Sequence, residues 1–243
     1  MGKITIGHHI SQQFNTELED IRNRVMAMGG LVEQQLADGV QSLVQADVEL
    51  GTLVASRDYQ VNAMEVGIDE ECTQIIAKRQ PTASDLRLII AVVKTITDLE
   101  RIGDEAERIG RMAVKLAGRD TLERRFDGLS SMADHVRQML HAALDAFART
   151  DVETAVETWH KDRIVDGEYE NLLAQINDYM MEDPRGIPWA LDILWSLRAL
   201  ERIGDRCRNI CEYVIYLVQG KDVRHTSLQD VQQELEDLDN PRT

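Results

Sequence analysis

The stretch Leu-Glu-Arg-Ile-Gly-Asp stands at residues 99–104 and again at residues 200–205, 101 residues further along the chain. A repeated hexapeptide at matching places in two similar halves indicates an internal duplication. Each copy carries two carboxylates four residues apart: Glu100 with Asp104, and Glu201 with Asp205. Side chains four residues apart on a helix lie one above the other on the same face. The repeat therefore indicates a fold with two similar halves and predicts one equivalent site in each half.

Helical periodicity dominates the chain, with apolar residues recurring at intervals of three and four. The joints between the periodic stretches carry helix punctuation. Asp47 and Asp151 are suited to cap helix N-termini, and Pro184 and Pro188 would interrupt a helix. We predict six helices, at residues 14–45, 48–79, 82–118, 121–149, 152–181 and 187–219. The fold class that follows is all-α.

The similarity of the two halves extends beyond the hexapeptide. An offset of 104 residues aligns the first two helices of each half, and matches Asp47 with Asp151, Leu36 with Leu140, Val40 with Leu144, and Val61 with Val165. Short connections make consecutive helices antiparallel neighbours. We therefore predict two tandem antiparallel three-helix bundles, at residues 1–119 and 120–220, followed by a flexible acidic tail at residues 221–243.

Composition restricts the classes of partner. The chain has 43 acidic against 27 basic residues and a net charge of −16, so phosphate backbones would repel it and direct nucleic-acid binding is disfavoured. The N-terminal sequence lacks the apolar segment of a secretory signal, and no run of 18 apolar residues is present. The three cysteines lie within predicted helices and favour a reducing compartment. We expect a cytoplasmic protein without membrane insertion.

A second polar pair recurs on the helix before each hexapeptide: Asp58 with Asn62, and Asp162 with Asp166. Two antiparallel helices would bring these oxygen-bearing side chains together with the hexapeptide carboxylates along a groove. Oxygen ligands suit Mg²⁺, Mn²⁺, Ca²⁺ or iron better than zinc. Gly103 and Gly204 stand beside the carboxylates within a helix, where glycine costs about 1 kcal/mol relative to alanine. Their presence indicates close packing or room for a bound group.

Three interpretations of this groove remain open. It is a metal site without chemistry of its own, the centre of a metal-storage or metal-dependent hydrolytic protein, or a solvated face on which Asp104 pairs with Arg108. The Glu-x-x-His signature of di-iron bundles is missing, which disfavours a buried oxygen-activating centre. The sequence also contains no nucleophile motif and no phosphate-binding loop.

The motifs together resemble those of the PhoU family of phosphate-transport accessory proteins. The resemblance rests on Glu-Arg-Ile-Gly-Asp on each third helix, the polar pair on each second helix, and the segments 9–18 and 79–87, and it covers about residues 9–220. It implies metal clusters of iron, manganese or magnesium, with zinc as a further candidate. The implied ligands are Asp58, Asn62, Glu100 and Asp104 in the first unit, and Asp162, Asp166, Glu201 and Asp205 in the second. Asn62 departs from a full carboxylate set, so the first cluster is expected to be looser or differently occupied.

The resemblance also implies a role, in which the protein is not an enzyme. The family acts as a negative regulator of the phosphate-starvation response and of phosphate uptake, and couples the ATPase subunit of the phosphate ABC importer to a phosphate-sensing histidine kinase. It implies a homodimer that is cytoplasmic and peripheral at the inner membrane through its partners. For the partner surface we nominate Asp85, Arg87 and Arg149, which lie near predicted helix ends. The structural alternative is that Asp85 caps a helix and Arg149 complements a helix dipole.

Overall fold

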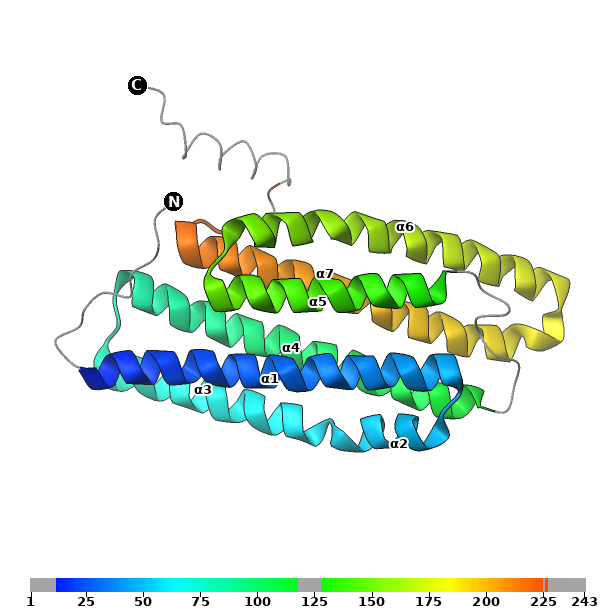
Figure 1. Ribbon diagram of the computed structural model, residues 1–243, viewed down its shortest axis with the longest axis horizontal. Coiled ribbons are helices and arrows are strands. Elements are labelled where there is room, and N and C mark those ends of the chain that lie inside the picture. The colour runs from blue at the N-terminus through cyan, green and yellow to red at the C-terminus, as the bar shows by residue number, and fades with distance from the viewer. Residues whose placement is uncertain (1–11, 118–127, 225, 227–243) are drawn as a thin grey trace, which may run out of the picture.

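The computed structural model describes residues 12–117, 128–224 and 226. Within these residues the regular structure is helical, which confirms the all-α fold class (Figure 1). The helices are α1 (Gln12–Gln45), α2 (Val48–Arg57), α3 (Tyr59–Arg79), α4 (Ala83–Leu116), α5 (Leu129–Arg149), α6 (Val152–Glu182) and α7 (Ile187–Gln219), with a short 3-10 turn, η2 (Pro184–Gly186), before α7.

The described helices form two units that lie side by side along one long axis. In Figure 1, α1 to α4 make the lower unit and α5 to α7 the upper unit, and α4 packs against α7 where the two units meet. Leu99 and Ile102 of α4 are fully buried, as are the corresponding Leu200 and Ile203 of α7. Each such side chain contributes roughly 1.5–3 kcal/mol when fully buried. The tandem arrangement predicted from the repeat is therefore confirmed.

The helix ends show which local predictions hold. Asp47 Oδ1 accepts a hydrogen bond from Leu50 N at 2.9 Å, and Asp151 Oδ1 accepts one from Thr154 N at 3.2 Å, so both caps are confirmed. The predicted helix at 121–149 begins at Leu129 instead, because Gly128 precedes it in a left-handed conformation with φ +108°. Residues 121–127 of that prediction, residue 118 of the helix before it and the predicted tail beyond residue 226 lie outside the described residues.

The predicted helix at 48–79 is interrupted at Asp58. The N–H groups of Val61 and Asn62 both point to the carbonyl oxygen of Asp58, at 3.0 and 3.3 Å, so the hydrogen-bond pattern restarts there. Asp58 itself keeps a helical conformation, with φ −54° and ψ −35°. In the second unit α6 runs without a break through the equivalent position, Asp162.

Two glycines allow α2 to lie close against α4. A β-carbon added to Gly51 would lie 2.7 Å from the carbonyl oxygen of Gly110, and one added to Gly110 would lie 2.9 Å from that of Gly51. Real β-carbons do not approach backbone so closely, so larger residues would push these helices apart. The contact sets how near Asp58, at the end of α2, comes to α4.

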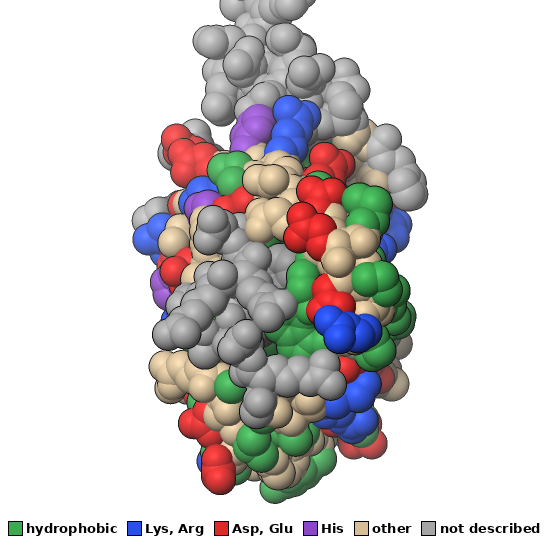
Figure 2. Space-filling view, turned by 90° about the vertical axis from the view of Figure 1, so that its right-hand side faces the viewer, with side chains coloured by type: hydrophobic (Ala, Val, Ile, Leu, Met, Phe, Trp, Pro, Cys, Tyr) green, Lys and Arg blue, Asp and Glu red, His purple; other side chains and the backbone are tan. Residues whose placement is uncertain are grey.

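The surface is mixed. Figure 2 looks at the end of the molecule where α6 ends and α7 begins, and shows apolar side chains among acidic and basic ones. Exposed apolar residues of these two helices include Met181, Leu191 and Trp195, which is 54% exposed. No helix among the described residues combines the length and apolar character needed to cross a membrane.

Candidate metal sites

The first candidate site lies where the break between α2 and α3 faces α4. Gly103 is the contact point: a β-carbon added there would lie 3.4 Å from Asp58 Oδ1 and 3.3 Å from Val61 Cγ1. Because Gly103 lacks that carbon, Asp58 lies beside the pair formed by Glu100 and Asp104. The structure thus brings together the helices that the spacing predicted, and the glycine in the hexapeptide has a packing reason.

Hydrogen bonds in the first site come from amides. Asn62 Nδ2 donates to Asp58 Oδ2 at 3.1 Å, and Gln35 Nε2, from α1, donates to Asp58 Oδ1 at 3.3 Å and to the Gly103 carbonyl at 3.4 Å. Asn62 Oδ1 and Gln35 Oε1 are buried and have no hydrogen-bond partner among the described residues. An unpaired buried acceptor costs roughly 1–3 kcal/mol. Two acceptor oxygens are therefore left available beside Asp58.

The pKa values of two carboxylates in the first site are raised, so the charged forms of Glu100 and Asp104 are disfavoured. Burial, followed by the nearby Asp104, raises the pKa of Glu100. Burial, followed by Asp58, raises the pKa of Asp104. Among the described residues, no Lys or Arg forms an ion pair with Asp58, Glu100 or Asp104. A cation would relieve this repulsion.

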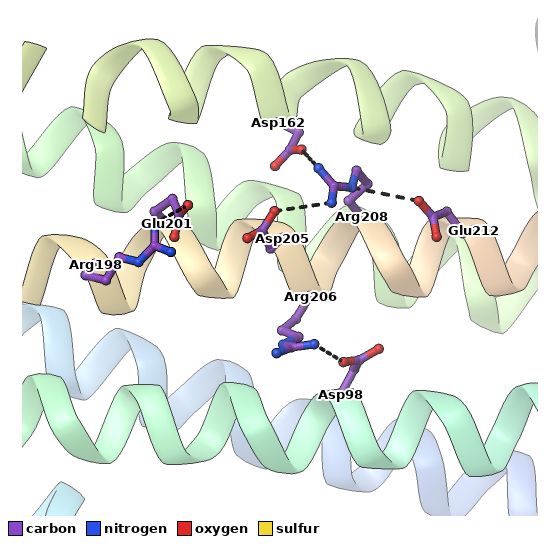
Figure 3. Close-up of polar contacts among 8 residues, drawn as sticks. All are labelled: Asp98, Asp162, Arg198, Glu201, Asp205, Arg206, Arg208 and Glu212. Atoms are coloured by element: carbon purple, nitrogen blue, oxygen red, sulfur yellow. Dashed lines mark hydrogen bonds and ion pairs between the residues drawn. The ribbon is translucent and has the colours of Figure 1, made fainter. Parts of the chain in front are cut away.

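The second candidate site repeats the same backbone arrangement between α6 and α7 (Figure 3). A β-carbon added to Gly204 would lie 3.6 Å from Asp162 Oδ1 and 3.5 Å from Val165 Cγ1, close to the values at Gly103. Asp162 is buried and faces Asp205, and Asp166 lies one turn further along α6. The duplication therefore extends to the geometry of the two sites.

The second site differs in containing arginine. Arg208 donates from Nη1 to Asp162 Oδ2 at 2.7 Å, and its Nη2 lies 3.3 Å from Asp205 Oδ1. Arg198 Nη1 donates to Glu201 Oε1 at 2.6 Å. Burial raises the pKa of Asp162, and Arg208 offsets part of that effect. Figure 3 shows the Arg208 guanidinium between the carboxylates of α6 and α7.

Neither set forms a ready-made cage for a cation. Among the described residues, no three His, Cys, Asp or Glu side chains converge closely enough to hold one metal ion. In donor chemistry the first set nevertheless fits a hard cation, because three of its members are carboxylates, Asn62 Oδ1 is unpaired, and the unpaired Gln35 Oε1 lies beside it. The second set also leaves one buried oxygen unpaired, Glu201 Oε2, but it fits less well because a guanidinium already lies among its carboxylates. Binding at either place requires side-chain rotation.

The nominated partner residues differ in exposure. Asp85 lies in the first turn of α4 and is only 6% exposed, and Arg87 is partly buried beside Gly220. Arg149 is exposed at the end of α5, where it pairs with Asp145 at 2.9 Å and lies 3.6 Å from Asp151. Of the three, Arg149 alone is exposed, and its charge is paired with acidic residues at the surface. Their contact role stays a prediction.

Sequence reasoning missed Gln35, Arg198 and Arg208. The signal for Arg208 was readable, since the offset of 101 residues aligns it with Glu107 and thus reverses the charge three residues after the hexapeptide. Gln35 gave a weaker signal, as one of two polar residues, with Ser42, on the mostly apolar buried face of α1.

The fold and the sites define a class: helical proteins built from two tandem units, in each of which a Glu/Asp pair on the last helix faces a second oxygen-bearing pair on the preceding segment. The PhoU domain matches residues 25–113 and 129–214. The chain belongs to the PhoU family, as the motifs indicated. The matched ranges fall within the predicted units 1–119 and 120–220, whose limits stay predictions.

Relatives match over nearly the whole chain. A phosphate-specific transport system accessory protein PhoU homolog of Pseudomonas aeruginosa is 50% identical over 236 residues, 97% of this chain and 98% of that protein. Its Escherichia coli K12 counterpart, PhoU, is 51% identical over 225 residues, 93% of each chain.

Solved structures agree with the fold. The crystal structure of PhoU from Pseudomonas aeruginosa superposes with a TM-score of 0.83 at 51% identity, and covers 86% of this chain and 100% of that one. The phosphate transport system regulatory protein PhoU from Streptococcus pneumoniae gives a TM-score of 0.80 at 29% identity, with 87% and 99% covered.

Proposed function

We propose that this protein is an accessory regulator of a phosphate-specific transport system. The observation that carries the proposal is sequence identity: about half of the residues, over nearly the full length, are identical to those of relatives named as accessory proteins of that system. The net charge of −16 agrees with protein partners in preference to nucleic acid. The protein acts through binding and is not an enzyme.

In this proposal the protein is a cytoplasmic adaptor and negative regulator. It binds the ATPase subunit of the phosphate ABC importer and a phosphate-sensing histidine kinase, works as a homodimer, and reaches the inner membrane through these partners. When phosphate is plentiful, the contact keeps the kinase from starting the phosphate-starvation response. Long helices in two packed units provide extended surfaces for two partners, and Arg149 is the nominated residue with an exposed charge.

Metal binding belongs to the same proposal. Asp58, Asn62, Glu100 and Asp104 would hold iron, manganese or magnesium in the first site, and the cation would supply the positive charge that these residues lack. Gln35 orients Asp58 through its amide, and Gly103 keeps α3 close to α4. Bound there, a cation would link α3 to α4 within the first unit.

Two experiments in cells test the adaptor role. Deletion of the gene should leave the phosphate-starvation response active in phosphate-rich medium, measured with a reporter for that response. Crosslinking at high and low phosphate, followed by mass spectrometry, should recover the importer's ATPase subunit and a histidine kinase in amounts that depend on phosphate. Normal repression in the deletion strain would contradict the proposal.

A biochemical control addresses the alternative of a storage or hydrolytic protein. Purified protein loaded with Mn²⁺ is assayed for turnover of phosphate esters and polyphosphate, beside the E100Q/D104N variant. The adaptor proposal expects no turnover that depends on these carboxylates. Turnover lost in the variant would move the function to the carboxylate groove.

A further inference from the structure

We infer that Arg208 is the resident counter-ion of the second carboxylate set and keeps metal cations out of it. The repulsion among the carboxylates would then be balanced differently in the two repeats. The first set would bind a metal cation, whereas the guanidinium of Arg208 would occupy the second set. The inference builds on the proposed metal binding at the first set.

The position of Arg208 supports this role. Its guanidinium reaches Asp162 on α6 at 2.7 Å, Asp205 on α7 at 3.3 Å and Glu212 at 3.8 Å (Figure 3). Asp162 is only 5% exposed, and the Arg208 side chain is 34% exposed. A planar, permanently charged guanidinium bridging two helices provides the charge and the cross-link that a bound cation would provide.

The equivalent position in the first unit carries the opposite charge. Glu107 stands there, and it turns to Arg111, its neighbour one turn on, at 2.5 Å. Arg198, which pairs with Glu201, corresponds to the neutral Thr97. Two arginines in contact with the second set thus have no counterpart in the first.

The two sites also differ in the residue that the first helix of each unit places beside them. Gln35 on α1 holds Asp58 with its amide, whereas the equivalent residue on α5 is Met139, which is fully buried and apolar. Asp162 therefore depends on Arg208 for a charged partner, while the hydrogen-bond donors of Asp58 are neutral amides. A cation entering the second set would have to displace a bonded guanidinium that is already partly buried.

Direct counting of bound metal tests the inference. Purified full-length protein, stripped with chelator, is dialysed against Mn²⁺ and its metal content is measured by mass spectrometry. E201Q/D205N should leave the Mn²⁺ content unchanged, and E100Q/D104N should remove most of it. R208Q should raise the content to about double, because each oxygen-ligand set would then bind a cation of its own.

Three controls make the result specific. R208K retains the charge and should show no gain. R206Q removes an arginine of the same helix that pairs with Asp98 on α4, outside the site, and should also show no gain. R208Q added to E100Q/D104N should restore binding, which would assign the new cation to the second set. Circular dichroism verifies that each variant is folded.

The outcomes separate the inference from the proposal on which it builds. Mn²⁺ bound by R208Q but not by the unaltered protein would support the role of Arg208 and refute metal binding at the first set. A loss of half or more of the Mn²⁺ in E201Q/D205N would overturn the inference, and this comparison needs no change to Arg208. No gain in folded R208Q would overturn it too, and the deletion strain tests the regulatory role independently.

Discussion

The two carboxylate sites share a backbone and differ in charge. At Gly103 and at Gly204 an aspartate from the facing helix lies within 3.4 to 3.6 Å of the place of a missing β-carbon, with Val61 and Val165 in matching contact. Around that shared frame, the first site has amide donors and no arginine partner, while the second has Arg208 and Arg198. A repeated motif thus predicts where side chains gather, but their electrostatic state depends on residues outside the motif.

The largest expected effect comes from reversing the charge that distinguishes the sites. R208E would place a carboxylate among Asp162, Asp205 and Glu212 and remove their partner, which should destabilise the fold by about 3–5 kcal/mol in urea unfolding. The reverse change in the first unit, E107R, would place a cation near Asp58 and Asp104 and should stay within about 1 kcal/mol of the unaltered protein. Equal losses in both variants would mean that the sites are electrostatically equivalent.

We expect the free energy of unfolding to depend on pH through a residue of the second unit, Glu212. Burial raises the pKa of Glu212 from its ordinary value of 4.5 to about 7, with Arg208 acting in the opposite direction. The folded state then binds more protons than the unfolded state between these values, so stability falls as pH rises from about 4.5 through 7. At about 1.4 kcal/mol per pKa unit, E212Q should remove a decline of about 3 kcal/mol.

The control for this pH effect is R111Q, at the equivalent position of the first unit. Its profile of unfolding free energy against pH should parallel that of the unaltered protein. A profile for E212Q that still declines through neutral pH would assign the effect to other groups.

A metal should stabilise one unit selectively. Mn²⁺ at about 100 times its dissociation constant should add about 2.7 kcal/mol to the free energy of unfolding, since it binds the folded state alone. The increase should vanish in E100Q/D104N and persist in E201Q/D205N, as measured by thermal unfolding with and without Mn²⁺. Persistence in E100Q/D104N would place the cation elsewhere.

The smallest effect concerns the two glycines. Alanine in a helix interior is favoured over glycine by roughly 0.5–1 kcal/mol. G204A should gain about that amount, because its β-carbon would lie at ordinary contact distances of 3.5 and 3.6 Å. G103A should gain less stability, because its β-carbon would lie at the tighter distances of 3.3 Å from Val61 and 3.4 Å from Asp58. Urea unfolding measures both variants. Equal midpoints would show that the neighbours of Gly103 move aside as easily as those of Gly204.

Prediction from sequence was strongest where interactions are local. Helix capping by Asp47 and Asp151 depends on residues three positions away, and both caps are present. The interruption at Asp58 could not be read from the periodicity, since Asp58 itself stays helical and only the hydrogen-bond pattern restarts. The start of α5 was misplaced because apolar periodicity does not reveal the left-handed conformation of Gly128.

The sequence by itself determined the helices, the two repeats and the oxygen-bearing residues that share each helix face, because these follow from spacing along one chain. Only the tertiary structure decided what each carboxylate meets. Gln35 reaches Asp58 from 23 residues away, and Arg208 reaches Asp162 from 46 residues away. Such partners are chosen by how helices pack, and packing places a neutral amide in one site and a permanent charge in the other.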